Sequence, residues 1–121
     1  MYKNYSINVN SKKSKNESLI NVKIIKPVID LGSVPSDTVV SVDFAIINIG
    51  RTTLKVDFVN PDCMCTEYKY SKKPILPGDT LLLTLKVNTK NKIGEQSLIT
   101  IIKLNTKEEL YKIMLNMNVA Y

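Results

Sequence analysis

The sequence contains no histidine, the side chain that most readily changes charge near neutral pH, among its 121 residues. This absence excludes a Cys-His nucleophile pair, histidine general-base catalysis and zinc sites that use imidazole ligands. The four glycines stand far apart, at Gly32, Gly50, Gly78 and Gly94, so the chain also lacks a glycine-rich phosphate-binding loop. We therefore expect a protein that is not an enzyme, with no catalytic residues, no cofactor and no assigned metal site.

Long apolar runs are also absent. The longest, such as Leu81-Leu82-Leu83, are far shorter than the roughly 20 residues that cross a bilayer as a helix, so we expect no transmembrane segment. No apolar core of roughly 7 to 15 residues follows Met1, so the chain as given carries no secretory signal. The question of a leader or a lipid anchor outside this chain is left open.

Arginine is nearly absent, because Arg51 stands against sixteen lysines. Seventeen basic and eleven acidic residues give a net charge of +6, which by itself suits an anionic partner. However, recognition of nucleic-acid bases and phosphates favours the arginine fork and charge clustered on one face, and these lysines are scattered along the chain. We expect a solvated, lysine-rich surface and no specific binding of nucleic acid.

The length and the composition indicate one soluble domain. A chain of 121 residues with 44% hydrophobic and 23% charged residues has room for a single core. Residues 10–18 are polar and charged without periodicity, so we interpret residues 1–18 as a tail or linker. Within this tail, residues 5–9 alternate briefly and either pair as an edge strand or have no fixed structure. The domain is predicted over residues 19–121.

Two-residue alternation of apolar side chains is the strongest pattern in the chain. It is clear over residues 40–46, 54–58, 81–87 and 111–119. Residues 98–104 are apolar on both phases, which predicts a central strand buried on both faces. Residues 19–31 are rich in β-branched side chains but contain Pro27, which confines them to an edge or to a strand that switches sheets.

Turn signals separate these strands. They lie at residues 32–37, 48–51, 77–79 and 92–95. Residues 108–115 have helical propensity, but the alternation that continues to Val119 favours a strand there. About seven strands at spacings near ten residues predict an all-β fold, an antiparallel β-sandwich.

Both cysteines lie in one short stretch, Cys63-Met64-Cys65, after a turn predicted at Asn60-Pro61-Asp62 in which Asp62 is expected to act as a cap. Residues i and i+2 of an extended strand lie about 6 to 7 Å apart, at or beyond the limit for a disulfide. We therefore expect no bond between Cys63 and Cys65 unless the corner bends.

Three interpretations of the two cysteines stay open. They are small thiols packed at the end of the sandwich, a redox or intermolecular disulfide site, or a soft-metal site for Cu(I). Alternation points the Met64 thioether away from the two thiols, which weakens the Cu(I) interpretation. Tyr68, Tyr70, Tyr111 and Tyr121 suit packing at the edge of the core or, alternatively, an aromatic binding surface.

Several short motifs resemble those of a bacterial family, domain of unknown function 1573. In order they are Ile29-Asp30-Leu31-Gly32, Asn48-Ile49-Gly50, Asp62-Cys63-Met64-Cys65-Thr66, Pro77-Gly78 and Asn105. The family usually has Asp-Phe-Gly, Asn-Thr-Gly, Cys-Gly-Cys-Thr and Pro-Gly at these places, so Leu31 and Met64 depart from its pattern. The resemblance covers roughly residues 28–119.

This resemblance implies an immunoglobulin-like sandwich of the pilus-chaperone and major-sperm-protein group. It also implies export to the bacterial periplasm, outer membrane or cell surface, because many members carry secretion or lipoprotein signals. The family has no established biochemical role. We expect a non-catalytic module that binds a protein partner, with the proline-interrupted first strand as the candidate edge. The alternative is a thiol redox or Cu(I) protein that uses Cys63 and Cys65.

Overall fold

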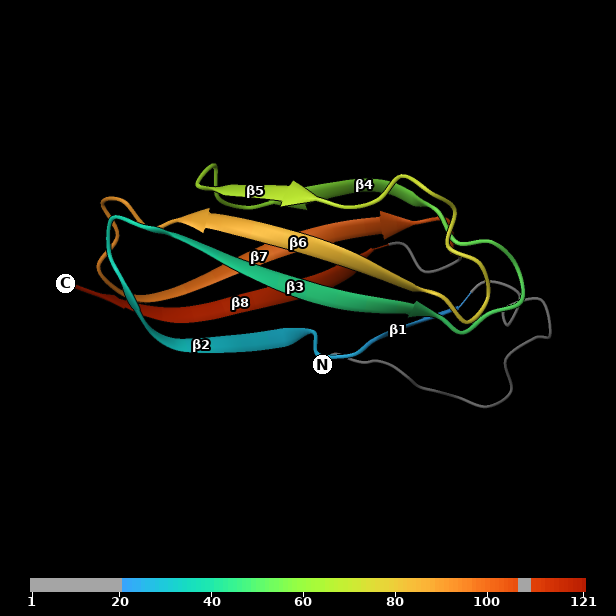
Figure 1. The fold of residues 1–121 in the computed structure, drawn as a ribbon, viewed down its shortest axis with the longest axis horizontal. Helices are drawn as coiled ribbons and strands as arrows, with labels where there is room; N and C mark the ends of the chain where they lie inside the picture. The colour runs from blue at the N-terminus through green and yellow to red at the C-terminus, as the bar shows by residue number, and fades with distance from the viewer. Residues whose placement is uncertain (1–20, 107–109) are drawn as a thin grey trace.

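The computed structural model describes residues 21–106 and 110–121, and all regular secondary structure in these residues is β-strand (Figure 1). The strands are β1 Val22–Ile24, β2 Val28–Pro35, β3 Val39–Asn48, β4 Val56–Pro61, β5 Thr66–Lys69, β6 Thr80–Asn88, β7 Gly94–Leu104 and β8 Tyr111–Ala120. The predicted all-β fold is confirmed, with eight strands in these residues because Pro27 divides the first predicted strand. The tail predicted over residues 1–18 lies outside the described residues.

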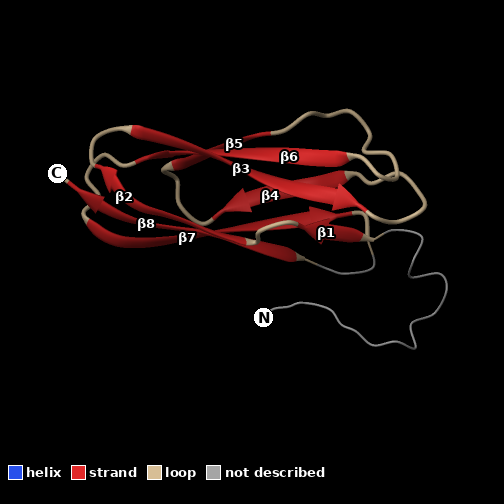
Figure 2. Cartoon of the chain, turned by 60° about the horizontal axis from the view of Figure 1, so that its bottom comes forward, coloured by secondary structure: helices blue, strands red, loops and turns tan. Residues whose placement is uncertain are grey.

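Two four-stranded sheets pack face to face, and Figure 2 shows them as two layers. One sheet has the order β1-β3-β6-β5 and the other has the order β2-β8-β7-β4. The predicted antiparallel sandwich is confirmed, with one exception: β2 pairs with β8 in parallel. Strands β1 and β2 form the edges on one side of the sandwich, and β5 and β4 form the edges on the other side (Figure 1).

The first predicted strand switches sheets at Pro27, which was one of the two alternatives that its sequence left open. Strand β1 pairs with β3 in one sheet, and after Pro27 the chain continues as β2 beside β8 in the other. The carbonyl of Pro27 still accepts the N–H of Met114 at 2.8 Å, although proline has no N–H of its own to donate. A strand interrupted by proline therefore supplies an edge to each sheet.

Strand β2 is longer than the sequence indicated, because residues 32–35 were predicted as part of a turn. Gly32 adopts φ of 70°, and its N–H donates to Asp30 Oδ1 at 2.8 Å, so the strand bulges there. After the bulge, Val34 is buried in the core and Pro35 ends the strand. Burial of Val34 outweighs the local turn signal. The Asp-x-Gly motif therefore forms a bulge.

The core lies between the sheets and follows the predicted alternation. Large side chains from β3, β6 and β8 are almost completely buried, among them Phe44, Ile46, Leu83, Leu115 and Met117. Each such side chain stabilises the fold by about 1.5–3 kcal/mol relative to an exposed one. The prediction of a strand over residues 111–119 is confirmed by β8.

Strand β7 is central in its sheet but is not buried on both faces, which corrects the prediction for residues 98–104. Thr100, Ile102 and Leu104 are buried against the other sheet, whereas Ile99 and Ile101 on the outer face are half-buried. Their neighbours on adjacent strands provide this partial cover, without a further layer among the described residues. The described part of the chain has no helix long and apolar enough to span a membrane.

Candidate functional site

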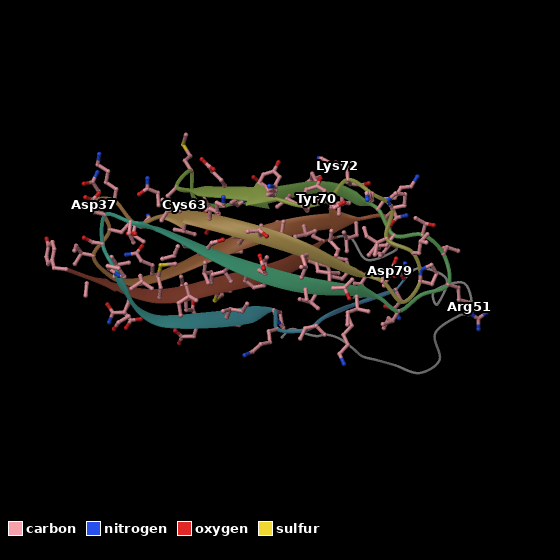
Figure 3. The ribbon with its side chains drawn as sticks, viewed as in Figure 1. Asp37, Arg51, Cys63, Tyr70, Lys72 and Asp79 are labelled. Carbon is pink, nitrogen blue, oxygen red and sulfur yellow. A yellow bond between two sulfur atoms is a disulfide. The ribbon has the colours of Figure 1, made fainter. Side chains whose placement is uncertain are left out.

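The cysteine corner, residues 62–66, connects β4 of one sheet to β5 of the other. Figure 3 shows Cys63 beside the start of β5. The turn predicted at Asn60 and Pro61 begins later, because β4 continues through Pro61. The N–H of Asp62 donates to Ile99 on β7, so alternation points the Pro61 nitrogen toward the open edge, where no ladder bond is lost. Proline therefore ends an edge strand here.

Asp62 does not cap its own turn. Its Oδ1 accepts the N–H of Ile99 at 3.1 Å, and its own N–H donates to the Ile99 carbonyl at 2.9 Å. The carboxylate therefore extends the pairing between β4 and β7 by one residue. This pairing anchors the first residue of the cysteine corner on the sheet.

Cys63 and Cys65 are joined by a disulfide, which corrects the expectation of two separate thiols. Their Cα atoms lie 5.1 Å apart, within the ordinary range for a disulfide. The backbone is bent, because the N–H of Thr66 donates to the carbonyl of Cys63 at 3.0 Å and closes a turn. In this bent backbone the two Cα atoms lie closer together than in an extended strand, so the disulfide can form.

The two sulfur atoms have different surroundings. Both cysteines are half-buried, but Cys65 packs against the hydrophobic core and Cys63 does not. The N–H of Cys65 donates to Cys63 Sγ at 3.1 Å, and Thr66 Oγ1 lies 3.7 Å from Cys65 Sγ. The carbonyl of Cys65 accepts the N–H of Asn88 at 3.0 Å. Main-chain bonds thus hold both cysteine backbones.

Met64 is fully exposed at the tip of the corner, with 103% relative exposure. Outside the glycines, the described residues have positive φ only at Asp37 and Asn91, so Met64 has a backbone conformation open to any L-residue. The glycine usual at this place in the family is therefore not required by the backbone of this chain.

The Cu(I) interpretation needs the reduced corner. Thiolate and thioether sulfurs suit Cu(I), but the disulfide uses both thiols and leaves no thiolate to coordinate a metal. The Met64 thioether projects into solvent. The described residues hold no group of three or more histidine, cysteine, aspartate or glutamate side chains arranged for a metal.

A second feature, which we call the lysine cleft, lies beyond the other end of β5. It is a hollow of about 300 Å³ lined by residues 54–57 and 70–75. Lys55, Lys72 and Lys73 line it, together with Asp57. The Asp57 carboxylate lies 3.6 Å from Lys103 Nζ, so its charge is already paired. The lining therefore carries an excess of positive charge.

One wall of the lysine cleft includes Tyr70 and Lys72, which follow the end of β5. The rings of Tyr68 and Tyr70 stack with their centroids 6.2 Å apart. Lys72 Nζ lies 4.5 Å from the centre of the Tyr70 ring and 3.3 Å from its hydroxyl. Figure 3 shows Tyr70 and Lys72 together, well separated from Cys63. These contacts place the Lys72 ammonium beside the Tyr70 ring.

Two asparagines hold the floor of the cleft. Asn48, completely buried, donates from Nδ2 to the carbonyls of Thr52 and Ile75 and accepts the N–H of Gly50. Asn105 accepts the N–H of Lys55 at 2.8 Å and donates to the carbonyl of Thr53. The motif residues Asn48 and Asn105 are therefore structural groups that position residues 52–55.

Only one of the two sites was found from the sequence. The pair Cys63 and Cys65 lies after a corner, as predicted. The lysine cleft was missed because Lys55 is 17 positions from Lys72 in the sequence. The alternation of Tyr68, Tyr70 and Lys72 was its one local signal. Tyr111 and Tyr121, the other two predicted aromatic positions, do not line the cleft.

The remaining two tyrosines serve different purposes. Tyr111 packs against the core, and its hydroxyl lies 3.0 Å from Thr106 Oγ1. Tyr121 is fully exposed at the end of the chain. The described tyrosines therefore form one stacked pair rather than a continuous aromatic surface.

These observations define an immunoglobulin-like β-sandwich of the PapD-like kind, with a disulfide in the connection between its sheets. The chain belongs to the family described as "Protein of unknown function (DUF1573)", which matches residues 22–119. This match confirms the resemblance carried by the short motifs. No curated protein matches the sequence.

Solved structures share the fold at low sequence identity. A protein of unknown function from Porphyromonas gingivalis has a TM-score of 0.71 at 15% identity, covering 90% of this chain and 51% of its own. The ASH/PapD-like domain of human CEP192 has a TM-score of 0.63 at 8% identity, covering 99% and 98%. WR4, a C. elegans MSP family member, has a TM-score of 0.51 at 12% identity, covering 85% and 99%.

These similarities confirm the predicted resemblance in fold to PapD-like and major-sperm-protein domains, and at these identities they show the fold alone. The chain spans about half the length of the Porphyromonas gingivalis protein. A family of unknown function with this fold is compatible with an interaction module.

Proposed function

We propose that this protein is a non-catalytic interaction module of the bacterial cell envelope that docks an extended acidic segment of a partner protein. The observation that carries this proposal is the lysine cleft beside the edge of β4. The partner segment lies in the cleft and pairs with the free side of β4, a mode of binding that many sandwich domains use.

The open side of β4 supplies the backbone groups for this pairing. Lys55 and Asp62 direct their backbone bonds toward Asn105 and Ile99 on the β7 side, so alternation turns Val56 and Val59 the other way. Among the described residues, the isolated bridge between Leu54 and Ile75 is the pairing recorded on that side. The partner segment in the cleft pairs with β4 from Val56 onward, just after the bridge at Leu54.

The predicted candidate edge, the proline-interrupted strand over residues 19–31, corresponds to β1 and β2. Strand β1 has only three residues, and β2 is poorly suited to this pairing. Pro35 ends it without an N–H, Pro27 precedes it, and the bulge at Gly32 interrupts its register. Prolines and bulges are devices that protect edge strands from pairing with another chain. Strand β4 also has a bulge, between Val56 and Phe58, and ends at Pro61. We therefore choose β4 over β2 as the docking edge because the lysine cleft lies beside it.

The positive charge of the cleft lining favours an acidic partner segment. Lys55, Lys72 and Lys73 line the cleft, and its single acid, Asp57, is paired with Lys103. An acidic segment complements this surface, and such complementarity favours both specificity and rapid association. Tyr70 and Pro74 add apolar surface for the side chains that lie between the acidic positions.

The disulfide supports a location outside the cytosol, because disulfides persist in oxidising compartments such as the periplasm and the cell surface. We propose one of these compartments, with membrane attachment through a lipid anchor on a segment outside this chain. Fractionation of cells that produce the native protein tests this. Recovery of the native protein in the cytosol with both cysteines reduced would contradict it.

A synthetic peptide tests the docking site. The probe is a peptide of about eight residues in which valine and glutamate alternate, long enough to pair with one strand edge. We expect NMR shifts at Val56 and Val59, and the double variant Lys72→Glu/Lys73→Glu to weaken binding by about tenfold or more. Asp57→Asn, which removes the negative charge in the cleft, is expected to strengthen binding about twofold.

The matched control is Lys23→Glu/Lys90→Glu, which makes the same change of net charge on β1 and in the β6–β7 connection. This control should leave peptide affinity within about twofold of the starting protein at physiological salt. Equal weakening by both double variants, or tighter binding of a single-stranded oligonucleotide than of the peptide, would reject the proposal.

A further inference from the structure

The Cys63–Cys65 disulfide lies within one connection and ties no two strands together. It closes a loop of three residues, so it removes little conformational freedom from the unfolded chain. The two sheets are held by the buried side chains between them, without help from this bond. A disulfide that adds little to the stability of the fold and lies half-exposed at one end of the sandwich points to a role in thiol–disulfide exchange.

The surroundings of the two sulfur atoms assign them different tasks. Both cysteines are half-buried, but Cys63 does not pack against the core, and this difference favours its sulfur as the one that an incoming thiolate attacks. Cys65 does pack against the core, and the Thr66 hydroxyl lies near its sulfur, in position to donate a hydrogen bond to a departing thiolate. The N–H of Cys65 points at Cys63 Sγ and favours negative charge there when that sulfur leaves in turn.

We propose that Cys63 and Cys65 form a redox-active pair that exchanges two electrons with a dithiol of a partner protein. Cys63 is the sulfur that bonds to the partner, and Cys65 is the resolving sulfur. This activity is separate from peptide docking in the lysine cleft.

The exchange proceeds through a mixed disulfide. A partner thiolate attacks Cys63 Sγ, a bond forms between these two sulfurs, and the Cys63–Cys65 bond breaks with Cys65 leaving as a thiolate. The second partner thiolate then attacks the partner sulfur of the mixed disulfide, and Cys63 leaves as a thiolate. The partner dithiol is oxidised to a disulfide, Cys63 and Cys65 are reduced, and the two protons of the dithiol end on them.

The corner is built to re-form its bond. The carbonyls of Cys63 and Cys65 accept the N–H groups of Thr66 and Asn88, and neither bond involves a sulfur atom. Both bonds therefore persist after reduction and keep the two Cα atoms near their separation of 5.1 Å. An intramolecular thiol held this close closes the ring faster than a second molecule of thiol attacks.

Reduction of the unmodified protein under native conditions is the first test. With dithiothreitol and no denaturant, we expect the reduction rate to rise in proportion to reductant concentration, because the bond is attacked in the folded state. A rate that stops rising and equals the rate of global unfolding would overturn the proposal. After reduction, excess dithiobis(nitrobenzoate) should release two nitrothiolates per chain and leave no adduct, whereas two retained adducts would also overturn it.

Single-cysteine variants test the assignment of roles. Cys65→Ser, which leaves Cys63, should react with dithiobis(nitrobenzoate) about tenfold faster than Cys63→Ser and should keep the reagent as a stable mixed disulfide. Equal rates would reject the assignment. Lys72→Glu/Lys73→Glu is the control, and it should leave the native reduction rate unchanged while it weakens peptide binding, which separates this site from the docking site.

Discussion

The cysteine corner and the lysine cleft lie at opposite ends of β5 and are assembled in opposite ways (Figure 3). The corner is local: its two reactive groups are two positions apart, and one turn brings them together. The cleft is not local: it forms where residues 54–57, at the start of β4, meet residues 70–75, which belong to the connection between β5 and β6 of the other sheet.

This difference in assembly predicts a difference in what each site contributes to stability. Residues 52–55 of the cleft floor are held by side-chain hydrogen bonds from Asn48 and Asn105. Asn105 lies 50 positions from Lys55, and Asn48 also bonds Ile75, 27 positions away. The corner depends on main-chain bonds at residues 62–66 that would survive the loss of its disulfide. Disruption of the cleft should therefore cost more stability than disruption of the corner.

Asn48→Ala is expected to have the largest effect, because it breaks the cleft floor and leaves the corner intact. Loss of its side chain leaves the carbonyls of Thr52 and Ile75 and the N–H of Gly50 without these bonds. We expect a loss of about 3 kcal/mol in the free energy of unfolding, measured by urea titration. Asn105→Ala, at a half-buried site, should lose about half as much, and a loss below about 0.5 kcal/mol for Asn48→Ala would show that the floor does not depend on it.

Cys63→Ser/Cys65→Ser breaks the corner and leaves the cleft intact. Loop-closure entropy for three residues gives an expected loss of about 1.5 kcal/mol in unfolding free energy. Binding of the alternating valine–glutamate peptide should be unchanged in this variant. A loss above about 3 kcal/mol, or a large loss of peptide affinity, would mean that the two sites are coupled through β5.

Met64→Ala sharpens the comparison within the corner and should have the smallest effect. The side chain is fully exposed and packs against nothing, so the free energy of unfolding should change by less than about 0.5 kcal/mol. The same urea titration measures it, and Leu83→Ala in the core provides a contrasting loss of about 2–5 kcal/mol. A loss near that of Leu83→Ala would place Met64 in a contact that the described residues do not provide.

Much of the fold was predictable because alternation is a local property. Val42, Phe44 and Ile46 already indicate which face of β3 is buried, and Pro27 limited the first strand to an edge or to a switch between sheets. The end of β2 was not predictable, because the burial of Val34 depends on the opposite sheet. The half-buried state of Ile99 and Ile101 likewise depends on how many layers the fold has.

The sequence by itself determined a β-sandwich and placed Cys63 and Cys65 just beyond a strand end, because side-chain alternation and turn residues act over a few positions. Only the structure showed that these cysteines are bonded, since the turn closed by Thr66 replaces the extended geometry that the pattern predicted, and the bond from Asn88 on β6 holds Cys65. It also decided that Lys55 and Lys72 share a cleft. Sheet pairing and the path of the 70–75 connection bring such distant residues together, and neither is encoded in local periodicity.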